Sequence, residues 1–200
     1  MYKVAIVIFD EFTDIDYFLM RDIFGRCRED WNVQVLGTKP FHTSTLGQKV
    51  ETDGHITLAN DADVVLFSSG QQGIPAVLAD ESFINAFKLD NTRQILGSIC
   101  AGSFVLQKLG LLNGTPATTH PDAMNAFINM GADLEDKPLV VRGNIVTAGG
   151  CLSALYLTGW IAEKLFNTDK RRQMHRQLLP ANQHVLFENI IHDAIEDAKI

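Results

Sequence analysis

The sequence has few cysteines, and they are not arranged to hold a metal ion or to cross-link a small fold. The three cysteines, Cys27, Cys100 and Cys151, show no CxxC spacing, and no clustered histidines accompany them. A zinc site is therefore not expected. An odd cysteine count without a recognisable secretion signal predicts a reducing compartment, and we expect a cytoplasmic protein.

Long apolar runs and an excess of positive charge are also missing. No apolar segment reaches the roughly 20 residues that span a bilayer, so no membrane partner is expected. Acidic residues (24) outnumber basic ones (17), and the net charge is -7. This balance argues against a nucleic-acid partner. Lys170–Arg172 form one small basic group, which we interpret as solvated surface.

The order of apolar segments indicates the fold class. With 200 residues, 46% of them hydrophobic, and no linker or repeat, we expect a single domain over residues 1–200. The predicted strands are Lys3–Phe9, Asn32–Gly37, Asp63–Phe67, Gln94–Ile99 and Ala117–His120, with a hairpin of Leu139–Val141 and Asn144–Thr147. The predicted helices are Ile15–Cys27, Ala76–Leu89, Ala101–Leu112, Asp122–Met130, Ser153–Phe166 and Val185–Ala198. This alternation predicts an α/β fold, a three-layer sandwich with a mainly parallel sheet flanked by helices.

Sites in such sheets form beyond the carboxyl ends of the strands. Three loops of this chain qualify: Asp10–Asp16, Ser68–Pro75 and Ser98–Gly102. We therefore expect these three loops to meet at one edge of the sheet.

Cys100 lies in the third of these loops, within GSICAGSFVLQKLGLLNG (Gly97–Gly114). Small residues around a thiol between a strand and a helix are typical of a nucleophile elbow. A helix N-terminus at that point would favour the thiolate. The alternative is a small cysteine packed in the core, which is how we interpret Cys27 and Cys151.

The segment Gly97–Phe127, GSICAGSFVLQKLGLLNGTPATTHPDAMNAF, resembles the nucleophile region of the ThiJ/PfpI superfamily. Its spacing is most similar to that of the isonitrile hydratase branch and of the sensor domains of AraC-type regulators. The order of elements from Lys3 to Phe166 also follows the superfamily. The resemblance implies a flavodoxin-like fold with a nucleophile elbow, no cofactor and a homodimer.

Two catalytic residues are implied by the resemblance. Cys100 is the implied nucleophile, and Asp16 matches the aspartate that faces the thiol in the hydratases. A carboxyl within hydrogen-bond reach of a thiol shares a proton with it, so the two groups would titrate as a pair. Asp10, Glu11 and Asp14 are competitors for this position, and only their helical register disfavours them.

Substrate-binding residues are implied in the same way. Backbone groups at Gly70, Gln71 and Ala101 are implied oxyanion donors, and His120, which ends the TTH motif, is an implied site-lining group. Asp122 offers a further arrangement, a Cys–His–Asp triad.

The sequence departs from the superfamily pattern at three of these places. Ala101 stands where hydratases carry threonine and protease-like members carry histidine, so a protease or amidase is disfavoured. Gln71 replaces a glycine, and Tyr156 occupies the place of an acidic residue.

These observations predict a cofactor-free cysteine enzyme that adds water to a small electrophile, as in the conversion of an isonitrile to an N-substituted formamide. Two alternatives stay open. One is a glyoxalase-like activity on ketoaldehydes. The other is a non-catalytic ligand-sensing, redox-sensing or stress-response protein.

Overall fold

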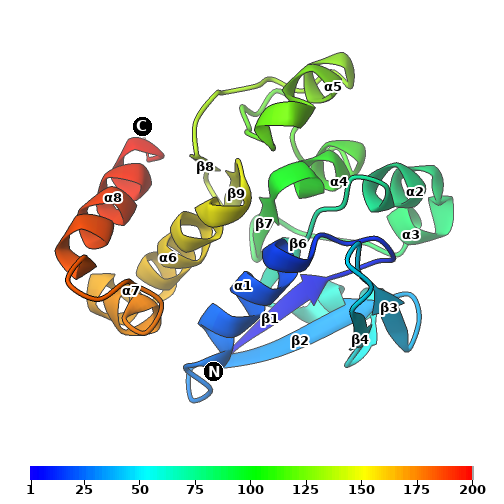
Figure 1. Ribbon diagram of the computed structural model, residues 1–200. Helices are drawn as coiled ribbons and strands as arrows, with labels where there is room; N and C mark the ends of the chain where they lie inside the picture. Colours follow the sequence, from blue (N-terminus) through cyan, green and yellow to red (C-terminus); the bar gives the residue numbers. More distant parts are fainter. Residues whose placement is uncertain (200) are drawn as a thin grey trace.

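A seven-stranded sheet forms the centre of the computed structural model, which describes residues 1–199 (Figure 1). Six strands are parallel, and the edge strand β8 is antiparallel to β9. The strands, in their order across the sheet, are β5 (Gly54–His55), β2 (Trp31–Gly37), β1 (Tyr2–Val7), β6 (Val64–Phe67), β7 (Ile95–Ile99), β9 (Ile145–Ala148) and β8 (Leu139–Arg142). A separate two-stranded sheet pairs β3 (Phe41–Thr43) with β4 (Lys49–Glu51).

The central strands are buried on both faces, as the continuous apolar runs predicted. Every residue of β6 and β7 is buried, and so are the last four of β1. Strands covered by helices on both sides lose the apolar–polar alternation of half-exposed strands. The hairpin prediction is also confirmed, since Gly143 occupies its turn with a φ of 64°.

Helices cover both faces of the sheet. The α-helices are α1 (Asp14–Gly25), α2 (Gly73–Ala79), α3 (Glu81–Asn85), α4 (Ser103–Lys108), α5 (Met124–Asn129), α6 (Ala154–Leu165), α7 (Thr168–His175) and α8 (His184–Asp197). The 3₁₀ turns are η1 (Ile56–Asp61), η2 (Cys100–Gly102), η3 (Pro121–Ala123) and η4 (Cys151–Ser153). Helix α1 contacts α6, whereas α2 contacts α3 and α4. The three-layer α/β prediction is confirmed.

Two predicted elements are divided or absent. The helix predicted over Ala76–Leu89 is two helices, because Asp80 takes an extended conformation and its carboxylate accepts hydrogen bonds from the amides of Ser82 and Phe83. Such a side chain caps the start of a new helix. The strand predicted at Ala117–His120 is reduced to an isolated bridge between Ala117 and Leu134.

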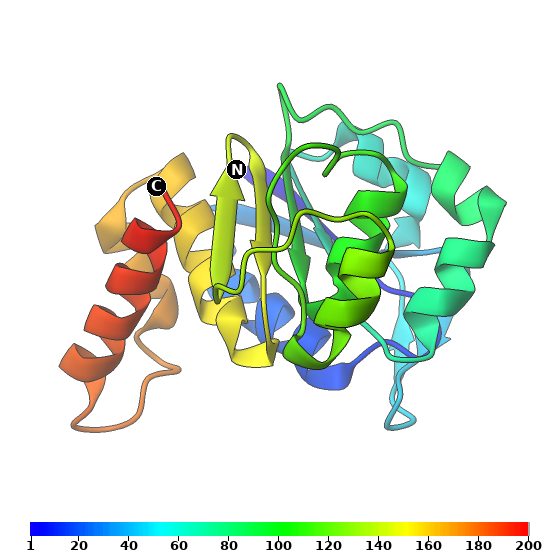
Figure 2. The same cartoon turned by 90° about the horizontal axis from the view of Figure 1, so that it is seen from above.

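Helix α7 was not predicted, and Arg171 within it is not solvated surface. Its side chain is 1% exposed and pairs with Glu163 on α6 at 2.8 Å and with Glu188 on α8 at 2.7 Å. A guanidinium can be buried in this way because carboxylates on two neighbouring helices neutralise it. The pairs join α6, α7 and α8, and Figure 2 shows α7 and α8 (orange to red) on one flank of the molecule, beside α6.

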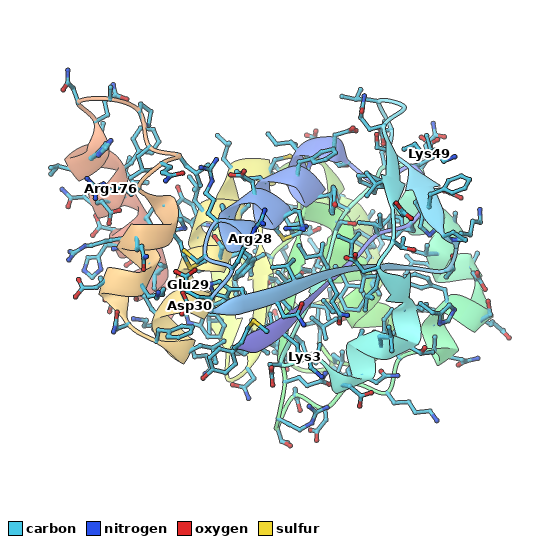
Figure 3. The ribbon with its side chains drawn as sticks, turned by 90° about the horizontal axis from the view of Figure 1, so that it is seen from below. Lys3, Arg28, Glu29, Asp30, Lys49 and Arg176 are labelled. Atoms are coloured by element: carbon cyan, nitrogen blue, oxygen red, sulfur yellow. The ribbon has the colours of Figure 1, made fainter. Side chains whose placement is uncertain are left out.

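Lys170, beside Arg171, also forms an ion pair. Its ammonium lies 2.7 Å from the carboxylate of Asp30, in the turn that precedes β2. Figure 3 shows Glu29 and Asp30 at this turn next to α7. Lys170 therefore ties α7 to the turn before β2, whereas Arg171 ties it to α6 and α8. Among residues 1–199, no helix is both long and apolar enough to cross a membrane.

His175 at the end of α7 is buried beside the same cation. Its Nε2 lies 3.3 Å from the Thr158 hydroxyl, and its Nδ1 has no hydrogen-bond partner. Burial, together with the charge of Arg171, lowers the pKa of His175 to about 3. The ring is therefore neutral in the folded protein at physiological pH.

This neutral ring makes stability depend on pH. The unfolded chain takes up a proton on His175 near pH 6.5, whereas the folded chain resists it down to about pH 3, so acid favours unfolding between these values. We expect this residue to lower the free energy of unfolding by about 2 kcal/mol between pH 7 and pH 5. In urea denaturation, the free energy of unfolding of His175→Gln should lack this decrease between pH 7 and pH 5. The variant His184→Gln, altered at an exposed histidine, should still show it. Identical pH dependence in wild type and His175→Gln would contradict the assignment.

Candidate active site

Four segments that follow β1, β6, β7 and β9 meet at the carboxyl edge of the sheet. They supply Asp16, Ser69, Cys100 and Cys151 to one cavity of about 310 Å³. The lining residues are Thr13, Asp16, Ser69, Gln71, Cys100, Ala101, His120, Asp122, Ala123 and Cys151. The three loops named from the sequence do converge, and the segment after β9 is a fourth that the sequence analysis missed.

Cys100 occupies a sharp turn between β7 and α4. Its φ is 50°, in the left-handed region that costs a non-glycine residue on the order of 1 kcal/mol. The hydroxyls of Ser103 and Thr119 donate to its carbonyl at 3.2 and 3.3 Å. Gly102 permits the bend, since a Cβ there would lie 2.5 Å from the Phe67 carbonyl oxygen. The predicted elbow is therefore present.

Asp16, on the first turn of α1, is the acid that faces the thiol. It is fully buried, and Cys100 Sγ lies 3.5 Å from its Oδ1. Its other oxygen, Oδ2, accepts a short hydrogen bond from the Ser69 hydroxyl. The position of Asp16 on α1 thus points its carboxyl into the site. Oδ2 is held by Ser69, and Oδ1 faces the sulfur of Cys100.

Two of the three competing acids, Asp10 and Asp14, are occupied elsewhere. Asp10 binds Lys39 and His42 through its two carboxylate oxygens, at 2.6 and 2.9 Å. Asp14 accepts from the Ser44 hydroxyl at 2.6 Å. The structure does not bring either carboxylate to Cys100.

Burial, rather than the helix N-terminus, dominates the electrostatics of the thiol. Desolvation raises the pKa of Cys100 well above that of an ordinary thiol, and the nearby Asp16 carboxylate and Cys151 raise it further. The sequence-based expectation of a thiolate favoured by the helix dipole is therefore wrong, because α4 has only six residues while Cys100 is 2% exposed. A buried anion next to a second anion is costly. The neutral thiol is therefore the favoured form of Cys100, and the Asp16 carboxyl is the acceptor that lies against it.

Cys151 lines this cavity and also packs against the core, as the sequence analysis expected of it. Its Sγ lies 3.7 Å from Cys100 Sγ, and its side chain is half-buried at the cavity wall. Burial raises its pKa, and the Asp16 carboxylate adds to the effect. The sequence did contain a signal for this placement, since Gly149-Gly150-Cys151 begins one residue after the predicted strand Asn144–Thr147. By contrast, Cys27 is buried in the core.

The implied binding residues fall into two groups. Gln71, Ala101 and His120 line the cavity, as does Ser69, which the sequence analysis did not single out. Gly70 does not line it. A Cβ at Gly70 would lie 2.2 Å from the Glu11 carbonyl oxygen, so this glycine allows two loops to pack backbone against backbone. Binding roles for these residues stay predictions.

A Cys–His–Asp triad is not formed. Nδ1 of His120 accepts a hydrogen bond from the backbone amide of Asp122 at 3.2 Å, so this nitrogen carries no proton to donate. The Asp122 carboxylate is 95% exposed and lies 3.9 Å from the same nitrogen. His120 therefore holds the loop that begins η3.

An α/β sandwich with a cysteine at a strand–helix elbow and a buried acid beside it defines a known class of proteins. The chain belongs to the DJ-1/PfpI family, whose model matches residues 2–164. The resemblance drawn from Gly97–Phe127 is thereby confirmed.

Similar proteins show the range within this family. The chain is 25% identical over 181 residues to Protein DJ-1 homolog B of Arabidopsis thaliana, covering 88% of this chain and 41% of that protein. It is 30% identical over 116 residues to an isonitrile hydratase of Pseudomonas putida, covering 57% of this chain and 50% of that protein. The chain thus spans about half the length of these curated relatives. A ThiJ/PfpI family protein of Pseudomonas syringae has a similar fold, with a TM-score of 0.81 at 18% identity over 98% of this chain and 88% of that one.

The effect of the Asp16 carboxylate on the pKa of Cys100 can be tested by alkylation. Replacing the acid in Asp16→Asn removes the negative charge that raises the pKa of Cys100, so the pH midpoint of its reaction with iodoacetamide should fall. The reaction is followed on the peptide that contains Cys100 by mass spectrometry, with Asp14→Asn as the matched control. A midpoint that rises in Asp16→Asn would show that the carboxyl stabilises the thiolate instead.

Proposed function

We propose that this protein is a cofactor-free cysteine enzyme that adds water to a small electrophilic carbon, with isonitriles as the substrate class. The observation that carries the proposal is the Cys100–Asp16 contact of 3.5 Å inside a cavity of about 310 Å³. A cavity of this size suits a small molecule. The isonitrile hydratase among the relatives supports the choice of reaction.

The first step forms a bond from sulfur to carbon. The Cys100 proton passes to Asp16, and the thiolate attacks the terminal carbon of the isonitrile. Asp16 then returns the proton to that carbon, which gives a thioimidate (R–N=CH–S–Cys100). Because Oδ2 is held by Ser69, the oxygen that faces sulfur is free to carry the proton in both directions.

The second step consumes water. Asp16, again a carboxylate, accepts a proton from a water molecule that attacks the same carbon. Asp16 passes that proton to the nitrogen, the C–S bond breaks, and the proton of the new hydroxyl goes to sulfur, which releases the N-substituted formamide and restores the thiol. Gln71 and the amide of Ala101 lie on the cavity wall, where they can orient the substrate and stabilise developing charge.

The reaction is tested by mixing purified protein with an alkyl isocyanide and following formamide by mass spectrometry. We expect turnover in wild type, and its loss in Cys100→Ser because a hydroxyl is a far weaker nucleophile. Asp16→Asn should be at least about 100-fold slower because it cannot relay the proton. Cys27→Ala, altered in the core away from the cavity, is the matched control. Absence of formamide with wild type, or formamide from Cys100→Ser, would refute the proposal. Methylglyoxal in a parallel assay tests the ketoaldehyde alternative.

Ala101 offers a second test of the same mechanism. A hydroxyl beside the nucleophile, as the hydratases carry, adds a hydrogen-bond partner for the attacking water. Such a bond contributes about 1 kcal/mol. We therefore expect Ala101→Thr to hydrate isocyanides several-fold faster than wild type, whereas Ala101→Val, with the same shape and no hydroxyl, should not. Equal rates for the two variants would show that the hydroxyl plays no part.

A further inference from the structure

Two thiols are in contact at the wall of the cavity, and the hydration mechanism uses only one of them. Cys100 Sγ and Cys151 Sγ lie 3.7 Å apart, and both cysteines are free. Each thiol also has Asp16 as a neighbour, and the three ligand atoms lie within 4.8 Å of one another. The third cysteine, Cys27, packs in the core.

We propose that Cys151 is a resolving cysteine, which converts an oxidised Cys100 to an intramolecular disulfide. The oxidant is a hydroperoxide, and the reductant that restores the pair is an external thiol. This inference goes beyond the hydration of isonitriles and does not depend on it.

The reaction needs the two thiols, Asp16, the hydroperoxide and the external thiol. The Cys100 thiolate attacks the distal oxygen of the hydroperoxide (ROOH), the O–O bond breaks, and the leaving RO⁻ takes the proton held by Asp16. The products are Cys100 sulfenic acid and ROH. The Cys151 sulfur then attacks the Cys100 sulfur, and its proton leaves with the hydroxyl as water. Two external thiols later reduce the disulfide and are themselves oxidised to a disulfide.

The fold places the two sulfurs close enough for this bond. Strands β7 and β9 are parallel neighbours, with Ile99 opposite Ala148, so both cysteines follow the same edge of the sheet. A disulfide needs a sulfur–sulfur distance of about 2.05 Å, so the atoms must approach by roughly 1.7 Å.

The structure assigns that movement to Cys151. Cys100 is held by hydrogen bonds to its carbonyl and is almost fully buried. Cys151 is half-buried and follows two glycines, of which Gly150 has a φ of 97° and open space around its Cβ position. Gly149 is packed closely against Thr118 and Thr119, so the adjustment falls on Gly150, whose open surroundings let the backbone before Cys151 move with little steric cost.

The disulfide would protect Cys100 reversibly against further oxidation. A sulfenic acid without a partner thiol goes on to the sulfinic acid, which ordinary thiols do not reduce. Disulfide formation stops this progression and removes the nucleophile from use until a thiol restores it.

The test is a peroxide titration of the reduced protein in the presence of a chelator, followed by intact mass and by counting alkylatable thiols. We expect wild type to lose two hydrogens and two alkylatable thiols, with peptide mapping that joins Cys100 to Cys151. Dithiothreitol should restore the original mass completely. Cys151→Ser, which conserves size, should instead gain two oxygen atoms on Cys100, and dithiothreitol should not reverse this.

Two further variants serve as controls for the peroxide titration. Cys27→Ala should behave as wild type, and Cys100→Ser should form no intramolecular disulfide. Formation of the sulfinic acid in wild type at the rate seen in Cys151→Ser would overturn the proposal, as would a disulfide that involves Cys27 or a second molecule. Failure of isocyanide hydration would leave this result unaffected, so the two proposals fail separately.

Discussion

The contact between the Cys100 thiol and the Asp16 carboxyl is the interaction on which the chemistry of this protein depends. The two residues are 84 positions apart in the sequence, and the parallel sheet brings them to one edge. Their burial disfavours a Cys100 thiolate beside the Asp16 carboxylate, because two buried like charges in contact are costly. The fold thereby determines the charge of the site as well as its shape.

Much of the fold could be predicted because its strongest signals are local. Continuous apolar runs mark β1, β6 and β7, and Arg142-Gly143 marks the hairpin turn between β8 and β9. Helix α7 could not be predicted in this way, since its sequence is almost entirely polar. It is stabilised by Arg171, whose partners Glu163 and Glu188 come from other helices. A buried ion pair leaves no periodic pattern in the sequence, so a charged residue of this kind is easily mistaken for surface.

The site shows the same division between local and long-range information. Cys100 and Asp16 could be named from a motif and a helical register, and the structure places them in contact. The direction of the pKa shift of Cys100 could not be derived from the sequence. A motif shows that the cysteine ends a strand, but not how deeply its side chain is buried. Cys151 was missed for a related reason. Its importance comes from the pairing of β7 with β9, which the sequence does not state.

Gly70 has a consequence for how this site can vary. Any side chain there would collide with the main chain at Glu11, and a main-chain clash cannot be relieved by choosing another rotamer. Of the two flanking residues that reach the cavity, Ser69 also holds Asp16, which leaves Gln71 as the side chain that can change without disturbing the acid. A new selectivity along this wall is therefore most readily obtained at Gln71, while the backbone at Gly70 stays fixed.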